Sequence, residues 1–219
     1  MAMNFIFENL IVIGIPLLFA ITLHEAAHGY VARFLGDSTA EKMGRITLNP
    51  IAHVDLIGTI LIPFFILFFS SGAFLFGYAK PVPVNPLYFK NPRRDMAYVA
   101  IAGPFSNFLM ALFWTFILKL SFSNGASDAA SFLGQMASAG ILVNLVLIAL
   151  NLIPIPPLDG GRIAVGFLPL RAAAVLNKME PYGLVIILIL LFTDLLSKII
   201  NPFIALLTRL LSVIFSVYS

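Results

Sequence analysis

The stretch LIVIGIPLLFAITLHEAAHGYVARFLG, residues 10–36, decides the fold. It is part of an apolar run from about residue 5 to residue 35, longer than the roughly 20 helical residues that cross a bilayer core about 30 Å thick. No positive charge precedes the run, which continues unbroken through His24, so we predict a helix that stays in the protein rather than a signal peptide. Three ionisable side chains, His24, Glu25 and His28, lie within this helix. Burying such side chains among apolar ones costs free energy unless they have binding partners, so we expect them to have a function.

The composition of the whole chain agrees with a membrane protein. Of its 219 residues, 60% are hydrophobic and 11% are charged, and the mean hydropathy is +1.01. One soluble core of this length cannot hide so much apolar surface. The 13 Lys and Arg residues are scattered and form no basic run, so we expect no nucleic-acid partner. Because the chain has no cysteine, a metal can be held only by histidines and carboxylates.

The apolar stretches long enough to cross a bilayer lie at about residues 5–35, 57–78, 97–120, 134–153 and 183–218. We expect the last to be two spans, broken at Lys198 to Pro202. Residues 162–180 mix charged and apolar side chains, as a helix lying on the membrane surface does. The sequence therefore predicts an all-α polytopic membrane protein with about five to six transmembrane helices. We expect one membrane-embedded domain over residues 1–219, with a core at about 5–162 and C-terminal helices at about 163–218.

Lysine and arginine indicate the orientation, because they collect in short cytoplasmic loops. They are absent before residue 5 and from residues 121–133, but present in residues 36–49, 80–94 and 162–178. The N-terminus is therefore expected outside, and residues 36–49 and 80–94 both inside. A single crossing by 57–78 would separate those two loops, so we predict that 57–78 re-enters the membrane instead. We expect a multi-pass protein of the cell (inner) membrane.

The pattern H-E-x-x-H in His24 to His28 carries the chemistry. Residues four apart lie on one face of a helix, so both imidazoles can bind one zinc ion. The Glu25 carboxylate beside them can accept the proton of the attacking water and pass it to the leaving amine. The helix is expected to end near Gly36, which places His28 roughly 12 Å inside it and the zinc within the cytoplasmic half of the bilayer.

A catalytic zinc ion needs a third protein ligand and an open position for water. The candidates are His53, Asp55, Asp159, Glu180 and Asp194. Asp159 is favoured, because it ends the motif N-L-I-P-I-P-P-L-D-G-G, residues 151–161, whose prolines and glycines predict an unwound backbone at membrane depth. The alternative for Asp159 is a turn or helix-capping role. His53 is expected to be a surface or gate residue.

Three asparagines are candidates for supporting roles. Asn144 and Asn151 are seven residues apart, so they share one face of an otherwise apolar helix. Asn151 either stabilises an oxyanion or holds the substrate, or it bonds a neighbouring helix, and the residues alone leave both open. For Asn144 the helix contact is favoured. Asn107, after Gly103-Pro104, is expected to brace the site, with substrate or oxyanion contact as its second candidate role.

These motifs, over about residues 23–162, resemble the site-2 protease family of intramembrane metalloproteases: H-E-x-x-H in the first span, Gly103-Pro104 with Asn107, and N-x-x-P-x-P-x-x-D-G-G. The resemblance implies a core of three transmembrane helices, His24, His28 and Asp159 as ligands of one zinc ion, and Glu25 as general base. It also implies an oxyanion or substrate role for Asn151 and a β-hairpin that dips into the membrane after the first helix. Many members carry PDZ or CBS domains, and we expect a short form without them.

The function expected is therefore an intramembrane zinc metalloendopeptidase that hydrolyses peptide bonds of membrane-spanning proteins or peptides. Substrate identity and oligomeric state stay open. The alternatives are a membrane metal-handling or transport protein, which would need polar groups strung across the bilayer, and an inactive zinc-binding scaffold. A scaffold would recruit a fourth protein ligand, such as His53, and would have no use for Glu25.

Overall fold

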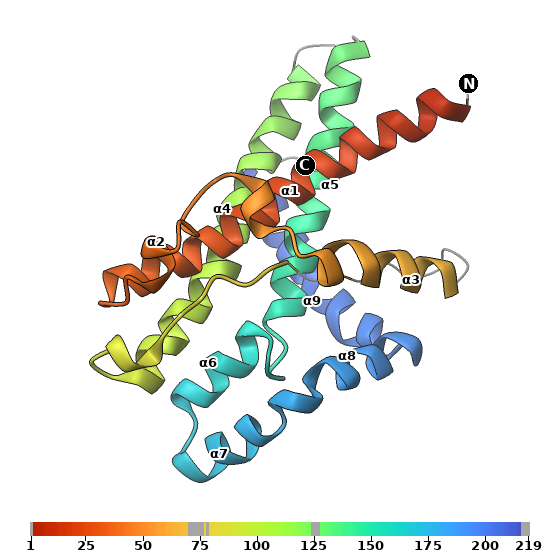
Figure 1. Ribbon diagram of the computed structural model, residues 1–219. Helices are drawn as coiled ribbons and strands as arrows, with labels where there is room; N and C mark the ends of the chain where they lie inside the picture. The colour runs from red at the N-terminus through yellow and green to blue at the C-terminus, as the bar shows by residue number, and fades with distance from the viewer. Residues whose placement is uncertain (1, 70–76, 78, 124–127, 216–219) are drawn as a thin grey trace.

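The computed structural model describes residues 2–69, 77, 79–123 and 128–215, and all regular elements in these ranges are helical (Figure 1). The all-α prediction is therefore confirmed. The α-helices are α1 (Ala2–Phe34), α2 (Thr39–Lys42), α3 (Ile62–Phe69), α4 (Pro92–Ser123), α5 (Asp128–Asn151), α6 (Asp159–Phe167), α7 (Leu170–Lys178), α8 (Gly183–Phe192) and α9 (Leu195–Phe215). Short 3₁₀ turns are η1 (Pro50–His53), η3 (Pro86–Tyr88) and η4 (Glu180–Tyr182), and η2 (Leu56–Leu61) is a π-helix.

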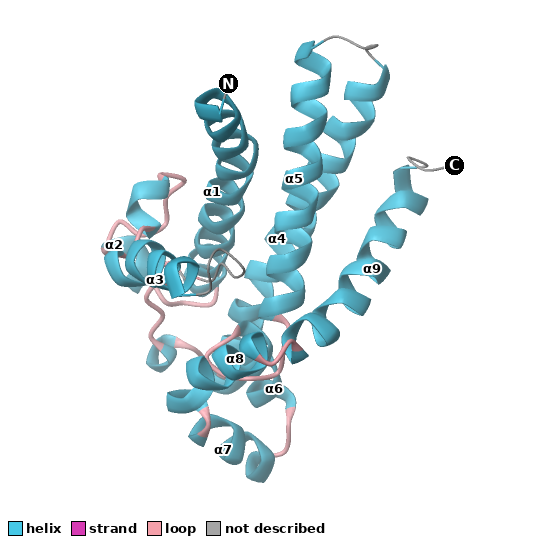
Figure 2. Cartoon of the chain, turned by 90° about the vertical axis from the view of Figure 1, so that its right-hand side faces the viewer, coloured by secondary structure: helices cyan, strands magenta, loops and turns pink. Residues whose placement is uncertain are grey.

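The three long helices α1, α4 and α5 form the core. In Figure 2, α4 and α5 lie side by side over most of their length, and α9 runs beside them. Small residues allow this close approach: a Cβ on Gly140 of α5 would lie 2.5 Å from the Trp114 ring of α4. Leu211 of α9 packs against Ala111 and Leu145, which joins α9 to the α4–α5 pair.

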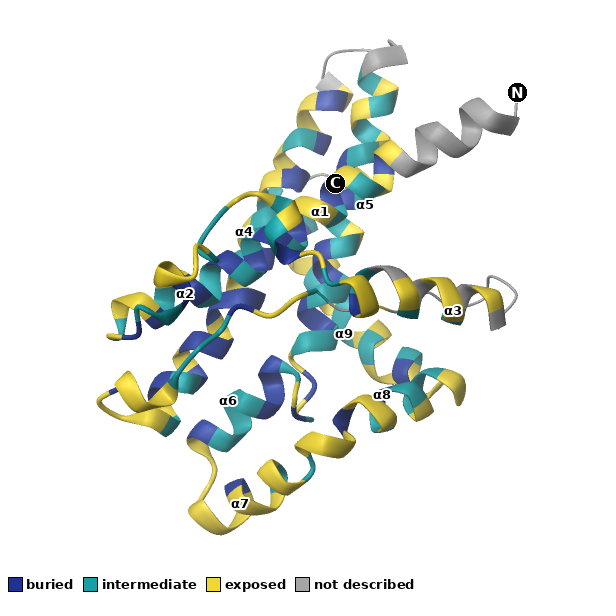
Figure 3. Cartoon of the chain, viewed as in Figure 1, coloured by how far each residue is buried: buried dark blue, intermediate teal, exposed yellow. Residues whose placement is uncertain are grey.

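The outer surfaces of these helices are apolar. Large side chains such as Phe19, Phe105 and Phe113 are half exposed, although each belongs to a long apolar helix. Buried residues gather where α1, α4 and α5 meet, whereas α3 and α7 are largely exposed (Figure 3). Five described segments are long and apolar enough to cross a membrane, which agrees with the predicted number of spans. The exposed apolar faces are those that contact lipid in such a protein.

The run 57–78 begins and ends at the same place. Lys80 N donates to His53 O at 2.9 Å, so the chain returns to its starting point after the run. The first part of the run is η2 followed by α3, which runs crosswise to the direction of α4 and α5 and lies apart from them (Figures 1 and 2). Helix therefore occupies residues 56–69, where the resemblance implies a β-hairpin. Residues 70–76 and 78 lie outside the described residues, so re-entry into the membrane stays a prediction.

The C-terminal third differs from the sequence-based expectation in two places. Residues 162–180 are not one surface helix, because α6 ends at Phe167 and Pro169 precedes α7. Of the two helices, α6 packs against α4 through its buried residues, including Gly166, and α7 is largely exposed. The break in residues 183–218 lies at Thr193 and Asp194 rather than at Pro202, which lies inside α9. Asp194 turns the chain in the left-handed conformation (φ 58°), which Asp tolerates better than most residues.

Asp37, just after α1, ties together the start of α2 and the segment that precedes η3. It is fully buried and accepts hydrogen bonds from Thr39, at the start of α2, and from Asn85 N at 2.6 Å. Burial alone would raise the pKa of the Asp37 carboxyl. The hydrogen bonds from Thr39 and Asn85 and the charge of Lys42 outweigh burial, and the pKa lies below its ordinary value of 3.8.

This pKa predicts how the stability depends on pH. A carboxyl whose pKa is lower in the folded state stabilises the protein above its unfolded pKa, and this stabilisation is lost as the pH falls below about 3.8 toward the folded pKa. We expect Asp37→Asn to lower the unfolding free energy at pH 7 by about 1.5–3 kcal/mol, the contribution of hydrogen bonds to a charged group. The difference from the wild type should shrink below about pH 4. Thermal unfolding in detergent between pH 3 and pH 7 measures both.

Glu41→Gln is the matched control. Glu41 forms one exposed ion pair, with Arg33, at 3.0 Å, and such pairs contribute about 0–1 kcal/mol. If Asp37→Asn destabilised the protein no more than Glu41→Gln does, the hydrogen bonds of Asp37 to Thr39 and Asn85 would not stabilise the fold as described.

The contacts at the end of α1 also predict a topology. Because Asn85 N donates to Asp37 and Lys80 N donates to His53 O, we expect residues 36–49 and 80–94 to lie on one side of the membrane. Single cysteines at the exposed positions Met43 and Asn91 should react with an impermeant thiol reagent from the same side. The chain has no other cysteine to interfere. Labelling from opposite sides would mean that 57–78 crosses the membrane once.

Candidate functional site

The H-E-x-x-H residues lie near the C-terminal end of α1. One helical turn separates His24 from His28, and their ring centroids are 4.7 Å apart. His24 is buried and His28 nearly so. Phe34, the last residue of α1, lies six residues after His28, which is about 9 Å along the helix. The histidines therefore lie inside the apolar part of the molecule. Because α1 ends at Phe34 and not at Gly36, they are slightly nearer to the end of the helix than expected.

Asp159 reaches these histidines from the other end of the sequence. After α5 ends at Asn151, residues 152–158 form the predicted unwound loop, and Asp159 is the first residue of α6. The glycines that follow are needed, because a Cβ on Gly160 would clash with Leu152 O and one on Gly161 with Pro156 N. The loop can thus fold directly onto the start of α6, which turns the Asp159 carboxylate toward α1.

The three side chains converge on one point. Asp159 Oδ2 lies 3.1 Å from His24 Nε2 and 3.4 Å from His28 Nε2, and all three atoms are within 4.8 Å of one another. In a tetrahedral zinc site with bonds of about 2.0–2.1 Å, the ligand atoms are about 3.3–3.4 Å apart. Asp159 Oδ2 is also buried without a hydrogen-bond partner among the described residues, as a carboxylate oxygen reserved for a cation is. The residues present fit a zinc ion.

Neighbouring groups fix which nitrogen of each histidine faces this point. His28 Nδ1 donates to the carbonyl oxygen of Val99 in α4 at 2.7 Å. His24 Nδ1 donates to Asn107 Oδ1 at 2.6 Å, and the Asn107 amide is oriented by donating to Ala20 O and Asn144 Oδ1. Both Nε2 atoms are therefore left unprotonated in the neutral rings, with their lone pairs directed at Asp159.

Gly103 of α4 leaves the space that the two imidazoles occupy. A Cβ at this position would lie 2.5 Å from His24 Nε2 and 2.6 Å from His28 Cε1. In the sequence, Gly103 stood out only as part of the motif that precedes Asn107. Its position against both rings came from the structure, although the Gly103-Pro104 motif was the signal that marked it.

Glu25 binds a different part of the chain, the extended segment that precedes η3. Its Oε2 accepts a hydrogen bond from Val82 N at 2.8 Å. Val82 is buried, and its side chain packs beside Gly29, one turn further along α1. One carboxylate oxygen is thus held by the backbone, and the other is available for a second partner. Nothing in the sequence pattern marked Val82, because its contribution is a backbone N–H.

The other candidate residues lie elsewhere. Asn151 Nδ2 donates to Leu147 O of its own helix, and among the described residues no hydrogen bond joins Asn151 to the three converging side chains. Asn144 contacts Asn107, as expected for a helix-to-helix bond. His53 is buried, not a surface residue, and bonds Thr47 O through Nε2. Asp55 caps η2. Glu180 and Asp194 lie outside the converging group, in η4 and after α8.

Comparison with known proteins agrees with this geometry. The sequence model of peptidase family M50 matches residues 12–139 and 120–193. The chain is 44% identical to the "Putative zinc metalloprotease YwhC" of Bacillus subtilis, over 86% of this chain and 83% of that protein. It is 27% and 28% identical to proteins named "Putative zinc metalloprotease Rip2" from Mycolicibacterium smegmatis and Mycobacterium tuberculosis, over 83% and 82% of this chain and 66% of each relative. No solved structure matches.

The family match covers most of the chain and includes α1 with its histidines, α4 with Gly103 and the Asp159 loop. The chain therefore belongs to peptidase family M50, the site-2 protease family of zinc metalloproteases.

Proposed function

We propose that the protein is an intramembrane zinc endopeptidase that cleaves membrane-spanning proteins or peptides, with one zinc ion held by His24, His28 and Asp159. The observation that supports it most is the convergence of these three buried ligand atoms, with Asp159 Oδ2 at 3.1 Å and 3.4 Å from the two Nε2 atoms, close to the spacing of ligands in a tetrahedral site. Three protein ligands leave a fourth position open, which is typical of catalytic rather than structural zinc.

Glu25 is the proposed general base. A bound zinc ion polarises the scissile carbonyl and lowers the pKa of water. The Glu25 carboxylate, adjacent in sequence to His24, takes the proton of the attacking water and later gives it to the departing nitrogen. The bond from Val82 N fixes one carboxylate oxygen and so limits rotation of the side chain, which leaves the other oxygen oriented for proton transfer.

The asparagines have different proposed roles. Both amide hydrogens of Asn107 are used, and its oxygen binds His24, so Asn107 positions His24 and does not contact the substrate. Asn151 uses one amide hydrogen on Leu147 O and retains the other, which can donate to an oxyanion or to the substrate backbone. This assignment leaves Asn151 as the one asparagine with a direct role in turnover.

The rival functions fit the structure less well. A closed zinc scaffold would use a fourth ligand, but His53 bonds Thr47 O instead of joining the group. A transport protein would need ionisable groups at several depths, whereas the group of described candidate ligands lies at one level near the end of α1. The positive loops favour a site toward the cytoplasmic side of the cell membrane.

The zinc ligand geometry is tested by Gly103→Ala. The added methyl would press on both imidazoles, so we expect zinc affinity to fall about tenfold to a hundredfold, the range seen when groups around metal ligands are disturbed. Gly14→Ala is the control, since a Cβ on Gly14 of α1 meets nothing within 4 Å. Competition with a zinc chelator measures the affinity. Elemental analysis of His24→Ala and Asp159→Ala, which each lack a proposed ligand, measures the loss of bound zinc. Equal zinc affinity in Gly103→Ala and Gly14→Ala would contradict the proposed ligand arrangement.

The reaction is tested by Glu25→Gln. We expect full zinc content but turnover lower by about a hundredfold to ten-thousandfold, because the amide cannot accept a proton. The measurement is cleavage of a panel of single-span substrates in proteoliposomes. Glu41→Gln, which removes an exposed carboxylate outside the site, should cleave like the wild type. Wild-type turnover by zinc-loaded Glu25→Gln would exclude this mechanism.

A further inference from the structure

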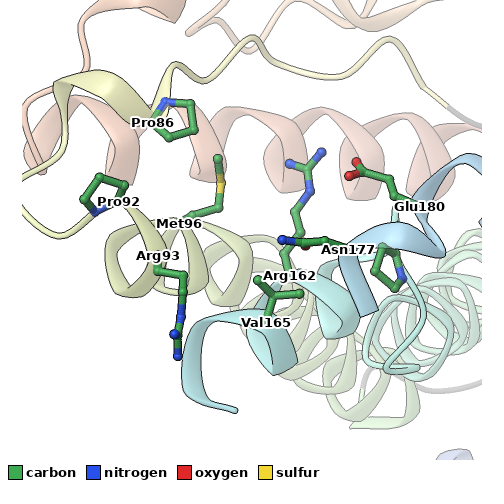
Figure 4. Close-up of a pocket in the computed structure, with 9 residues that line it drawn as sticks. Pro86, Pro92, Arg93, Met96, Arg162, Val165, Asn177 and Glu180 are labelled. Atoms are coloured by element: carbon green, nitrogen blue, oxygen red, sulfur yellow. The ribbon is translucent and has the colours of Figure 1, made fainter. Parts of the chain in front are cut away.

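A cavity of about 400 Å³ lies beside the zinc-ligand loop but is not part of the zinc-ligand group (Figure 4). It is bordered by η3, the first residues of α4, the loop before Asp159, α6, and the end of α7 with η4. Its wall is largely apolar, with Met96 and Val165 among the lining residues. Arg162 extends into it from α6, one turn after Asp159 on the same side of that helix.

The cavity carries one available positive and one available negative charge. Arg93 also lines it but points away from the other labelled side chains, and it donates to the carbonyl oxygens of Gly166 and Leu168 (Figure 4). Neither Arg162 nor Glu180 forms an ion pair with another described residue. Arg162 is half-buried, and its guanidinium makes no hydrogen bond to any described residue. A guanidinium beside apolar walls needs an anionic partner.

The surroundings indicate that this partner comes from the membrane. The cavity lies at the start of a candidate span, since Pro92 lines the cavity and is also the first residue of Pro92–Phe122. Three residues after Glu180, α8 begins, and its apolar side chains such as Val185 and Ile189 are exposed. Acyl chains can cover that helix while a headgroup enters the cavity at the interface.

A peptide fits the cavity less well. Three of its lining residues are prolines, Pro86, Pro92 and Pro156, which offer no backbone N–H to pair with an extended chain. A purely anionic group would approach Arg162 but would also meet the Glu180 carboxylate. A ligand with both a phosphate and an ammonium group satisfies both side chains.

We propose that this cavity binds the phosphoethanolamine headgroup of a membrane phospholipid, with the phosphate on Arg162 and the ammonium on Glu180. The proposal is independent of the protease function, because it concerns lipid binding. The lipid would also buttress the Asp159 loop, since Pro156 lines the cavity on one side and belongs to that loop.

The test is lipid retention by the full-length protein. Protein reconstituted with equal amounts of phosphatidylethanolamine, phosphatidylcholine and phosphatidylglycerol of matched chains is transferred to mild detergent, and retained lipid is measured by native mass spectrometry. The wild type should retain phosphatidylethanolamine about tenfold or more over phosphatidylcholine, whose quaternary ammonium cannot donate to Glu180. Arg162→Gln should lose this retention by a similar factor.

Two further variants complete the test. Glu180→Gln changes an exposed side chain without a partner, so it should fold normally and shift the preference from phosphatidylethanolamine toward phosphatidylglycerol. Arg171→Gln, on exposed α7 outside the cavity, should behave like the wild type. Equal retention of the three lipids by the wild type, or an unchanged preference in Glu180→Gln, would overturn the proposal. A photoreactive residue at Asn177 that cross-links a peptide rather than phospholipid would also overturn it.

Discussion

Burial of one carboxylate against two imidazoles is the constraint on which the rest of the structure depends. Asp159, His24 and His28 come from segments more than 130 residues apart, yet their ligand atoms meet inside an apolar bundle. An unpaired carboxylate there would be strongly unfavourable. The proposed zinc ion would complete the group, and α1, α4 and the loop before Asp159 hold its three side chains in place.

The helices meet this requirement through small and polar residues at the contacts. Asn107 bonds α1 through His24 and Ala20 O, and α5 through Asn144, so one amide orients three helices. Gly103 provides the volume for the imidazoles. In a bilayer, association between helices gains little from the hydrophobic effect, and such close contacts and hydrogen bonds take its place. The bonds that join the helices are therefore also the bonds that orient His24, a proposed zinc ligand.

The segment between α1 and α4 connects the site with the membrane surface. Its extended part bonds two carboxylates. Val82 N donates to Glu25, inside α1, and Asn85 N donates to Asp37, just after α1. Glu25, the proposed general base, is therefore held by the backbone of a segment that also bonds Asp37, just after the end of α1. Rigid anchoring of this kind suits a group that must transfer a proton in a fixed direction.

The sequence by itself determined the membrane class and the long helices, and it marked the residues proposed to bind zinc, because apolar length and the spacing of His24, Glu25 and His28 are local properties of the chain. It also placed Asp159 in an unwound loop, since proline and glycine act locally. Only the tertiary structure assigned Gly103 to the imidazoles and Val82 to Glu25, and it alone buried His53. It also placed the last helix break at Thr193 and Asp194 and the exposed Pro202 inside α9, since a proline is tolerated within a membrane helix. These features arise from contacts between distant segments, which no local pattern encodes.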